Sequence, residues 1–445
     1  MSLSFHNTPG SAAFQEWLKA QELYQQGHYE DSFFALTAGF IKDADYVPLY
    51  QLAAAVTAQL DAPGAQELFT EIAENLDNPV LFDELGYLYF EGQQWALAAL
   101  FFEKSLQLHP ENPDALYDLA LCYGHMTEFQ KAIGALTQRL TPDFWCSYLL
   151  CKYKIFCGER EGVKEDIEAL TSFPEAQLKE NQSEIPALKI IELREMLERC
   201  YQVESLRTHI RVWQFIQYGS AVLDCHENKK QSSGGRYVSV VHTYESIKTW
   251  AVIAKTFFST HSVNITQIAA LPDRDSEILG RVLAKILEVN FTIYDEESST
   301  GNQLIIAAEG SLFDNCYELG VISNGNILLA FWQNWLCSSY ICPDIIGCMA
   351  QSCEFPWNVA GIQMIDTEMH TFAPRNENHL SPEEVAVNIC NAVSENIVTS
   401  GLDFYAGRKE FLKGIGRYSG EHRYNFMTES PVPGSWFNSD FLNLL

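Results

Sequence analysis

The fold of the N-terminal half is decided by residues 78–142, which read NPVLFDELGYLYFEGQQWALAALFFEKSLQLHPENPDALYDLALCYGHMTEFQKAIGALTQRLTP. Large or apolar residues recur there at the spacing of a helix face, and the pattern returns 34 residues later. The matching positions are Phe82, Leu85, Gly86, Tyr89, Ala98 and Phe102 in the first copy, and Leu116, Leu119, Ala120, Tyr123, Ala132 and Leu136 in the second. Pro110 and Pro142 end the copies, because proline has no N–H to donate. Each copy therefore predicts a pair of helices joined by a short turn.

This internal repeat resembles the tetratricopeptide repeat in spacing and in residue type. A small residue, Gly86 in the first copy, stands where the two helices must approach closely, and an aromatic residue fills the gap beside it. The resemblance covers about 65 residues. It implies helix pairs that stack into a superhelical solenoid with a concave inner face, on which a peptide or a partner domain binds.

Three further helix pairs are predicted on either side of this stretch, at residues 12–42, 46–76 and 143–170. We therefore expect a helical repeat domain over residues 1–172. Residues 173–225 contain longer helical patterns that do not repeat, and they are interpreted as a cap and bridge. Residues 226–235 are polar and end in Ser-Ser-Gly-Gly, which predicts a linker.

After residue 236 the pattern changes to short β-branched runs that alternate with helices. Strands are predicted at residues 237–244, 263–271, 290–294, 304–308 and 326–332, and helices at 245–260, 276–288 and 382–399, with a short one near 311–319. This alternation is typical of an α/β domain with a mainly parallel sheet and helices on both faces. We expect it to span residues 236–445, and this half resembles no family. The whole chain is thus predicted to join an all-α solenoid to an α/β domain.

The chain has 445 residues and a formal net charge of −29, from 58 acidic and 29 basic side chains. A surface with this much negative charge repels phosphate backbones. Nucleic acid is therefore not expected as a partner. The charge has two interpretations: general solubility, or an acidic face that attracts a basic peptide. The sequence shows no secretory signal and no apolar stretch near 20 residues. We therefore expect a cytoplasmic protein without a membrane span.

The resemblance places the peptide groove on the first helix of each pair. The positions that match exposed groove positions are Asp83, Tyr87, Phe90, Tyr117, Asp118, Cys122 and Lys152. Their mixture of polar and aromatic side chains suits an extended peptide with varied side chains. An open alternative is that the C-terminal half or the tail of the same chain occupies this groove.

A candidate catalytic loop, with Asp273, Arg274 and Asp275, lies between a predicted strand and a helix. Ligands of open α/β sheets bind beyond the carboxyl ends of the strands, so this loop could hold a polar substrate or a metal-bound phosphate. The alternative is structural: one aspartate caps the helix and Arg274 pairs with the other. No phosphate-loop or G-x-G-x-x-G pattern supports the first interpretation.

Four cysteines, Cys337, Cys342, Cys348 and Cys353, lie within 17 residues. Four thiols in so short a stretch could hold zinc or an iron–sulfur cluster. Their spacing contains no close pair of the kind that zinc knuckles need, however, so we expect no metal and no cofactor. Interleaved isoleucines favour buried structure instead, and Asp344 and Trp357 are candidates for the lining of a pocket.

A basic segment in the acidic chain is a candidate anion-binding site, with Arg408, Lys409, Lys413, Arg417 and Arg423. The alternative is that these side chains pair with carboxylates of the protein itself.

The leading functional hypothesis is a scaffold that binds a peptide or a partner domain. The second is an enzyme or ligand-binding protein whose α/β domain handles a nucleotide or phosphosugar, with the solenoid as targeting arm. The third is a homo-oligomer built through exposed helix faces. The sequence does not name the partner or the oligomeric state.

Overall fold

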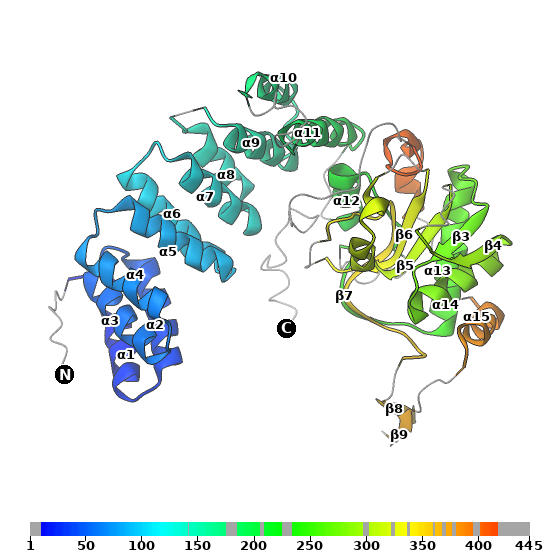
Figure 1. Ribbon diagram of the computed structural model, residues 1–445, viewed down its shortest axis with the longest axis horizontal. Helices are drawn as coiled ribbons and strands as arrows, with labels where there is room; N and C mark the ends of the chain where they lie inside the picture. Colours follow the sequence, from blue (N-terminus) through cyan, green and yellow to red (C-terminus); the bar gives the residue numbers. More distant parts are fainter. Residues whose placement is uncertain are drawn as a thin grey trace. The chain divides into compact units, whose positions relative to one another are not determined.

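The computed structural model describes residues 10–140, 142–174, 185–204, 209–224, 234–296, 302–321, 325–335, 339–358, 361–366, 371–375, 380–394 and 401–416. These residues divide into two compact units. The first, or helical unit, extends to Arg194, and the second, or sheet unit, begins at Glu195. The division falls inside helix α11 (Ile185–Tyr201). Figure 1 labels the helices and strands along the chain.

The helical unit consists of helix pairs, as the sequence predicts. In chain order these are α1 (Phe14–Gln25) and α2 (Tyr29–Lys42), α3 (Val47–Gln59) and α4 (Pro63–Glu74), α5 (Pro79–Glu91) and α6 (Trp95–Leu108), α7 (Pro113–His125) and α8 (Phe129–Thr137), and α9 (Phe144–Phe156) and α10 (Val163–Ala169). Each pair follows the previous one along the array (Figure 1). Helices α5, α7 and α9, each the first of its pair, contact one another in succession.

Local sequence sets where these helices begin. The side chain of Asn78 accepts a hydrogen bond from the N–H of Val80, and Asn112 accepts one from the N–H of Asp114, each at 3.1 Å. A proline follows each asparagine, at a position where a helix needs no donor. The close approach of α5 and α6 depends on Gly86, because a Cβ there would lie 2.8 Å from the ring of Phe102.

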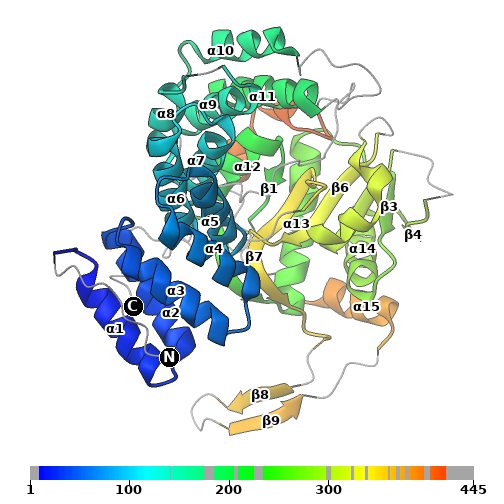
Figure 2. The ribbon, with the colours of Figure 1, turned by 60° about the vertical axis from the view of Figure 1, so that its left-hand side comes forward.

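The sheet unit contains one parallel sheet in the order β4-β3-β5-β6-β7-β1. β2 also pairs with β7, along residues that follow those paired with β1. Its strands are β1 (Ala221–Val222), β2 (Arg236–Val241), β3 (Gln267–Ala270), β4 (Asn290–Ile293), β5 (Leu304–Glu309), β6 (Ile327–Gln333) and β7 (Ile345–Glu354). Every pairing in this sheet is parallel. The α/β class with a parallel sheet is therefore confirmed (Figure 2).

Alternate residues of the central strands pack on opposite faces of the sheet. On one face, α14 (Arg274–Leu287) lies close to Ala270 and Ile306, since a Cβ at Gly280 would come within 3.1 Å of both side chains. α13 (Tyr244–Thr260) and α15 (Pro382–Asn391) contact α14 and each other. On the other face, Ala269, Ile305 and Ala307 form a core with the 3₁₀ turns η3 (Gly310–Asn315) and η4 (Tyr317–Gly320).

Three features of the sheet unit differ from the sequence prediction. The long strand β7 was not predicted, because its first six residues are buried without alternation and only its last four alternate between half-buried and exposed side chains. The antiparallel pair β8 (Gly361–Asp366) and β9 (Thr371–Arg375) was also missed. The predicted helix 382–399 ends at Asn391.

The segment predicted as a helical cap, 173–225, contains helix α11 and helix α12 (Ile210–Tyr218), but also strand β1. β1 pairs with β7, so the sheet unit begins well before residue 236. Most of the predicted linker 226–235 lies outside the described residues. Among the described residues, no helix is long and apolar enough to cross a membrane.

Candidate functional site

The helical unit has an acidic hollow of about 540 Å³, formed by α4, α5, α6 and α7. Five carboxylates line it: Asp83, Glu84, Glu91, Asp114 and Asp118. None of the described residues that line it is a lysine, an arginine or a histidine. Apolar surface lies beside these charges, because Tyr87 and Leu88 also line the hollow and both are exposed. The hollow thus combines negative charge with exposed apolar side chains.

Partial burial makes two carboxylates of the acidic hollow, those of Asp83 and Asp118, costly to ionise. Burial raises the pKa of Asp118 to about 6, and the neighbouring charges of Asp114 and Asp83 add to the shift. Burial also raises the pKa of Asp83, although its carboxylate accepts a hydrogen bond from the amide of Asn112 at 2.8 Å. A cation placed in the hollow would lower both pKa values, because an opposite charge favours the ionised form.

Of the predicted groove residues, the structure places Asp83, Tyr87 and Asp118 around the acidic hollow. Phe90 packs instead against Trp95, with ring centroids 4.9 Å apart, and Tyr117 lies edge-on to Trp145 at 6.5 Å.

Cys122 and Lys152 were expected to be exposed, and that expectation is wrong. Cys122 is fully buried, and Lys152 is 4% exposed with its ammonium 5.9 Å from the centroid of the Tyr148 ring. Both positions lie on the packed side of their helices, because neighbouring pairs bury more of each first helix than the repeat pattern alone indicates.

The sequence prediction missed Glu84, Glu91 and Asp114 as members of the acidic hollow. A signal for one of them was present: Asp114 and Asp118 are four residues apart, so they share one helix face. Asp114 lies in the first turn of α7, where the helix dipole favours a negative charge, and Asp118 follows one turn later.

The sheet unit has a second pocket, of about 560 Å³, at the carboxyl ends of β3, β5, β6 and β7. It lies where the strand order reverses. From β3 the chain continues to β4 at one edge of the sheet, and from β4 it crosses back past β3 to β5. Ligands of open parallel sheets bind at this kind of switch point. We call it the switch-point pocket; its charged lining residues are Asp273, Asp275, Glu309 and Glu354.

Two of the three candidate catalytic residues line the switch-point pocket. Asp273 caps α14, accepting a hydrogen bond from the N–H of Ser276 at 2.9 Å. Asp275 accepts hydrogen bonds from Trp357 Nε1 and Asn358 Nδ2, both at 2.7 Å. Arg274 donates to the carbonyl of Leu380 at 2.7 Å and is not among the lining residues. The capping role fits the structural alternative, and a catalytic role for these residues stays a prediction.

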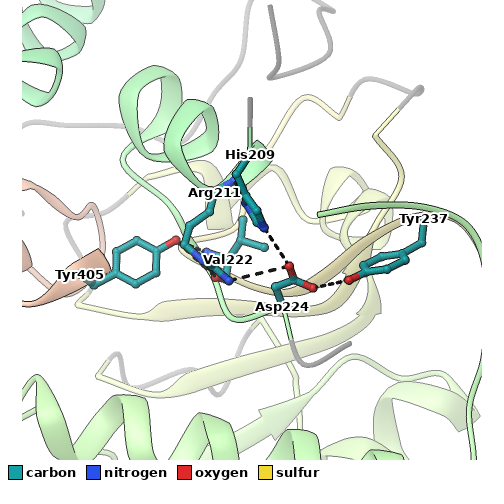
Figure 3. A network of polar contacts seen from close by, with 6 residues as sticks. All are labelled: His209, Arg211, Val222, Asp224, Tyr237 and Tyr405. Carbon is teal, nitrogen blue, oxygen red and sulfur yellow. Dashed lines mark hydrogen bonds and ion pairs between the residues drawn. The ribbon is translucent and has the colours of Figure 1, made fainter. Parts of the chain in front are cut away.

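A buried polar network surrounds Asp224, which follows β1 (Figure 3). The carboxylate of Asp224 accepts hydrogen bonds from Tyr237 Oη at 2.8 Å and from His209 Nε2 at 3.1 Å, and Arg211 lies 3.8 Å away. Arg211 also donates to the carbonyl of Val222 at 3.1 Å, and Tyr405 Oη accepts from the N–H of Val222 at 2.7 Å.

The polar groups of the Asp224 network contact one another within the sheet unit. Nδ1 of His209 accepts the N–H of Arg211 as the cap of α12, so both ring nitrogens make hydrogen bonds within the fold. Burial by itself raises the pKa of Asp224, but the hydrogen bond from His209 and the charge of Arg211 lower it overall. The network joins α12, β1 and β2 to Tyr405, which lies 183 residues after Val222.

The predicted cysteine cluster is only partly brought together. Cys337 lies outside the described residues. Cys342 lies 3.1 Å from Gln214 Nε2 and 3.3 Å from Ser220 Oγ, and burial raises its pKa to about 11. Cys348 and Cys353 lie close to each other and to His242, with one ligand atom of each within 4.8 Å of the others. No sequence pattern pointed to His242, which lies more than 100 residues before the cysteines.

The pocket residues suggested from sequence near these cysteines have structural contacts. Asp344 is buried and accepts a hydrogen bond from the N–H of Leu328 at 2.8 Å. Trp357 is buried and holds Asp275.

The basic segment makes contacts within the sheet unit. Arg408 donates to the carbonyl of Gln202 at 2.8 Å, and Lys413 pairs with Glu195 at 3.0 Å. Lys409 lies 3.5 Å from the carbonyl of Ser262. Arg417 and Arg423 lie outside the described residues. These contacts fit the alternative of internal pairing, and anion binding by this segment stays a prediction.

Comparison with known proteins identifies the repeats. Residues 101–134 match a family model described as tetratricopeptide repeat. Residues 101–134, which run from α6 to α8, therefore match the repeat that the resemblance predicted, and the match does not extend into the sheet unit.

One relative in sequence is the uncharacterized protein ycf37 of Pyropia yezoensis, which is 36% identical over 70 residues. The match spans 15% of this chain and 39% of that relative.

Solved structures similar to the chain include YrrB, described as a TPR protein with an unusual peptide-binding site. It is 16% identical, with a TM-score of 0.22, over 36% of this chain and 84% of YrrB. PilF of Pseudomonas aeruginosa is 16% identical, with a TM-score of 0.25, over 42% of this chain and 85% of PilF.

Proposed function

We propose that the protein is an interaction scaffold whose repeat array binds a basic peptide segment of a partner in the acidic hollow. The observation that carries this proposal is the lining itself: five carboxylates beside exposed apolar side chains, with no basic residue among the described lining residues. Lysine and arginine side chains fit such a lining in two ways, because their cationic ends pair with carboxylates and their aliphatic stems cover apolar surface.

The raised pKa of Asp118 also supports a cationic ligand. A carboxylate whose ionisation is opposed by burial and by neighbouring carboxylates gains more from a cation than an exposed one does. The overall charge of −29 adds long-range attraction for a basic segment, which speeds its association.

The test is fluorescence anisotropy of the full chain titrated into a labelled peptide of about ten residues rich in lysine and arginine, with an acidic peptide as comparison. Asp118→Asn removes one charge from the hollow and is expected to weaken binding by about tenfold, because a hydrogen bond to a charged group contributes about 1.5 kcal/mol or more. The matched control is Glu165→Gln, which removes the same charge from the exposed surface of α10 and is expected to leave the affinity unchanged.

The pH dependence of binding sharpens this test. Because the pKa of Asp118 is about 6, its charge is lost as the pH falls from neutral to about 5, and binding of the basic peptide weakens with it. Asp118→Asn should show a smaller pH dependence. The proposal would be contradicted if the acidic peptide bound as tightly as the basic one. It would also be contradicted if Glu165→Gln lost as much affinity for the basic peptide as Asp118→Asn.

A second candidate function, binding of a small ligand, is favoured by the location of the switch-point pocket. Its four carboxylates disfavour a bare nucleotide or phosphosugar, so such a ligand would have to carry its own divalent metal. The test is a thermal-shift series on the full chain with nucleotides and sugar phosphates, each with and without Mg²⁺.

The control for the second candidate compares Asp275→Asn, in the lining, with Arg274→Ala, outside it. A ligand that binds this pocket should lose its stabilising effect in the first variant and keep it in the second. If no member of the series raises the melting temperature of the wild-type chain, this candidate is wrong for these ligand classes.

A further inference from the structure

The sheet unit brings together three metal-binding side chains from separate parts of the sequence. One ligand atom each of His242, Cys348 and Cys353 lies within 4.8 Å of the other two. Ligands that share a tetrahedral zinc ion lie roughly 3.5–3.8 Å apart, given Zn–S near 2.3 Å and Zn–N near 2.0–2.1 Å. Rotations of the two cysteine side chains would shorten the distances between ligand atoms from the 4.8 Å limit to this spacing.

The backbone holds these residues in place. Cys348 and Cys353 both belong to β7, and His242 directly follows β2, which pairs in parallel with the second half of β7. The N–H of His242 donates to the carbonyl of Glu354 at 2.9 Å, so the histidine is anchored beside Cys353. The pairing of β2 with β7 therefore preorganises His242 beside Cys353, whereas the proximity of Cys348 rests on the measured distance between the ligand atoms.

The surroundings suit a soft metal ion. His242 and Cys348 are 2% and 1% exposed, and the imidazole packs between Phe331, at 4.7 Å, and Phe355, at 5.8 Å between ring centroids. Thiolate and imidazole ligands select zinc over the hard ions Mg²⁺ and Ca²⁺. A low-dielectric shell strengthens the attraction between thiolates and a dication.

The fourth coordination position would face the switch-point pocket. Cys353 is half-buried and lines that pocket, whereas the other two side chains are fully enclosed. Two cysteines and one histidine with an open position form the arrangement of catalytic rather than closed structural zinc sites. The carboxylates of Glu309 and Glu354 also line the pocket and add negative charge near a bound cation.

We propose that His242, Cys348 and Cys353 bind one Zn²⁺ ion whose open coordination position faces the switch-point pocket. This site is independent of the acidic hollow, so it can be tested whether or not the repeat array binds a peptide.

The experiment uses the full chain purified under reducing conditions and loaded with zinc alone. Elemental analysis after desalting is expected to give about one zinc per chain, since three protein ligands of this type retain the ion. Cys348→Ala and His242→Ala should each weaken zinc affinity by at least about a hundredfold in competition with a chromophoric chelator, because losing a direct ligand costs more than losing an outer-shell partner. Cys390→Ala, a partly buried cysteine on α15, is the matched control and should retain the ion.

Replacement of zinc by Co²⁺ in the wild-type chain keeps the test valid if a variant does not fold. Tetrahedral coordination with thiolates gives intense visible absorption and a sulfur-to-cobalt charge-transfer band. The proposal would be overturned if the cobalt-loaded chain lacked these bands or if the wild-type chain retained no zinc. It would also be overturned if Cys390→Ala lost as much zinc affinity as Cys348→Ala. A disulfide between Cys348 and Cys353 in the protein purified under reducing conditions would overturn it as well, because it would remove both thiolates.

Discussion

Individual glycines decide how closely the repeat helices pack. A Cβ at Gly86 would lie 2.8 Å from the buried ring of Phe102, and one at Gly124 would lie 2.2 Å from the hydroxyl of Tyr153. Gly134 also lies in a repeat helix, α8, but a Cβ there would meet nothing within 4 Å. The three glycines therefore look alike in the sequence and differ in what surrounds them.

Alanine substitutions at two of these glycines should have opposite effects. Gly86→Ala is expected to lower the free energy of unfolding by about 1–2 kcal/mol, because overpacking outweighs the gain in helix propensity. Gly134→Ala should raise it by about 0.5–1 kcal/mol, because only the propensity changes. Urea-induced unfolding of the full chain measures both. A stabilised Gly86→Ala variant would show that Phe102 can move away at little cost.

Asp224 stabilises the fold through its contacts with His209, Tyr237 and Arg211. Its φ is +47°, a left-handed conformation that asparagine also tolerates, so Asp224→Asn removes the charge without adding backbone strain. The folded state lowers the pKa of Asp224, so the ionised form stabilises the fold. This contribution is present above the unfolded pKa of about 3.9 and is lost as the pH falls through the lower folded value.

Asp224→Asn should therefore lower the free energy of unfolding at pH 7 by about 2–4 kcal/mol, the usual cost of breaking a buried, hydrogen-bonded charge network. The difference from the wild type should shrink below about pH 4, where the carboxylate becomes protonated. Urea unfolding across this pH range is the measurement, with the exposed Asp403→Asn as control, expected within about 0.5 kcal/mol of the wild type. A pH-independent difference would contradict the ionised network.

At the scale of elements, the N-terminus of α14 serves both structure and the candidate pocket. Asp273 caps this helix and also lines the switch-point pocket. Loss of function in an alanine variant would therefore not distinguish the two roles. Asparagine caps helices about as well as aspartate but carries no charge, so it separates them.

We expect Asp273→Ala to cost about 1 kcal/mol of stability, the usual value of an N-cap, and Asp273→Asn to cost less than half of that. Thermal and urea unfolding of the two variants measure this difference. If both variants lose the same stability, charge rather than capping is the contribution of Asp273 to the fold. Any ligand effect that disappears in Asp273→Asn, whose fold is intact, then belongs to the pocket.

For the whole molecule, the excess of carboxylates sets its behaviour in solution. The net charge of −29 at pH 7 keeps copies of the chain apart, and the isoelectric point of about 4.7 is where this repulsion vanishes.

Solubility should therefore pass through a minimum near pH 4.7 and recover towards neutral pH. Light scattering at several pH values and two salt concentrations measures this minimum and, at pH 7, the oligomeric state. Stable dimers at neutral pH in spite of the repulsion would favour the hypothesis that exposed helix faces build a homo-oligomer. Scattering that stays flat through the isoelectric point would contradict the expected minimum.

The sequence by itself determined the helix pairs and the α/β class, because both rest on local periodicity. Positions such as Gly86 and Phe102 repeat at the period of one helix pair, and a β-branched run such as that of β2 marks a strand. It also located Asp83, Tyr87 and Asp118 on the first helices and placed Asp273 and Asp275 after a strand. Strand β7 escaped prediction because its first six residues, which are all buried, have no alternating pattern.

Only the tertiary structure decided which of these residues meet. It buried Cys122 and Lys152, joined the carboxylates of α5 and α7 around one hollow, and brought His242 to two cysteines more than 100 residues away. The physical reason is that periodicity records which face of an element is buried, whereas sites arise from the pairing of distant elements. The order of strands in the sheet and the packing between helix pairs fix that pairing, and no local pattern encodes it.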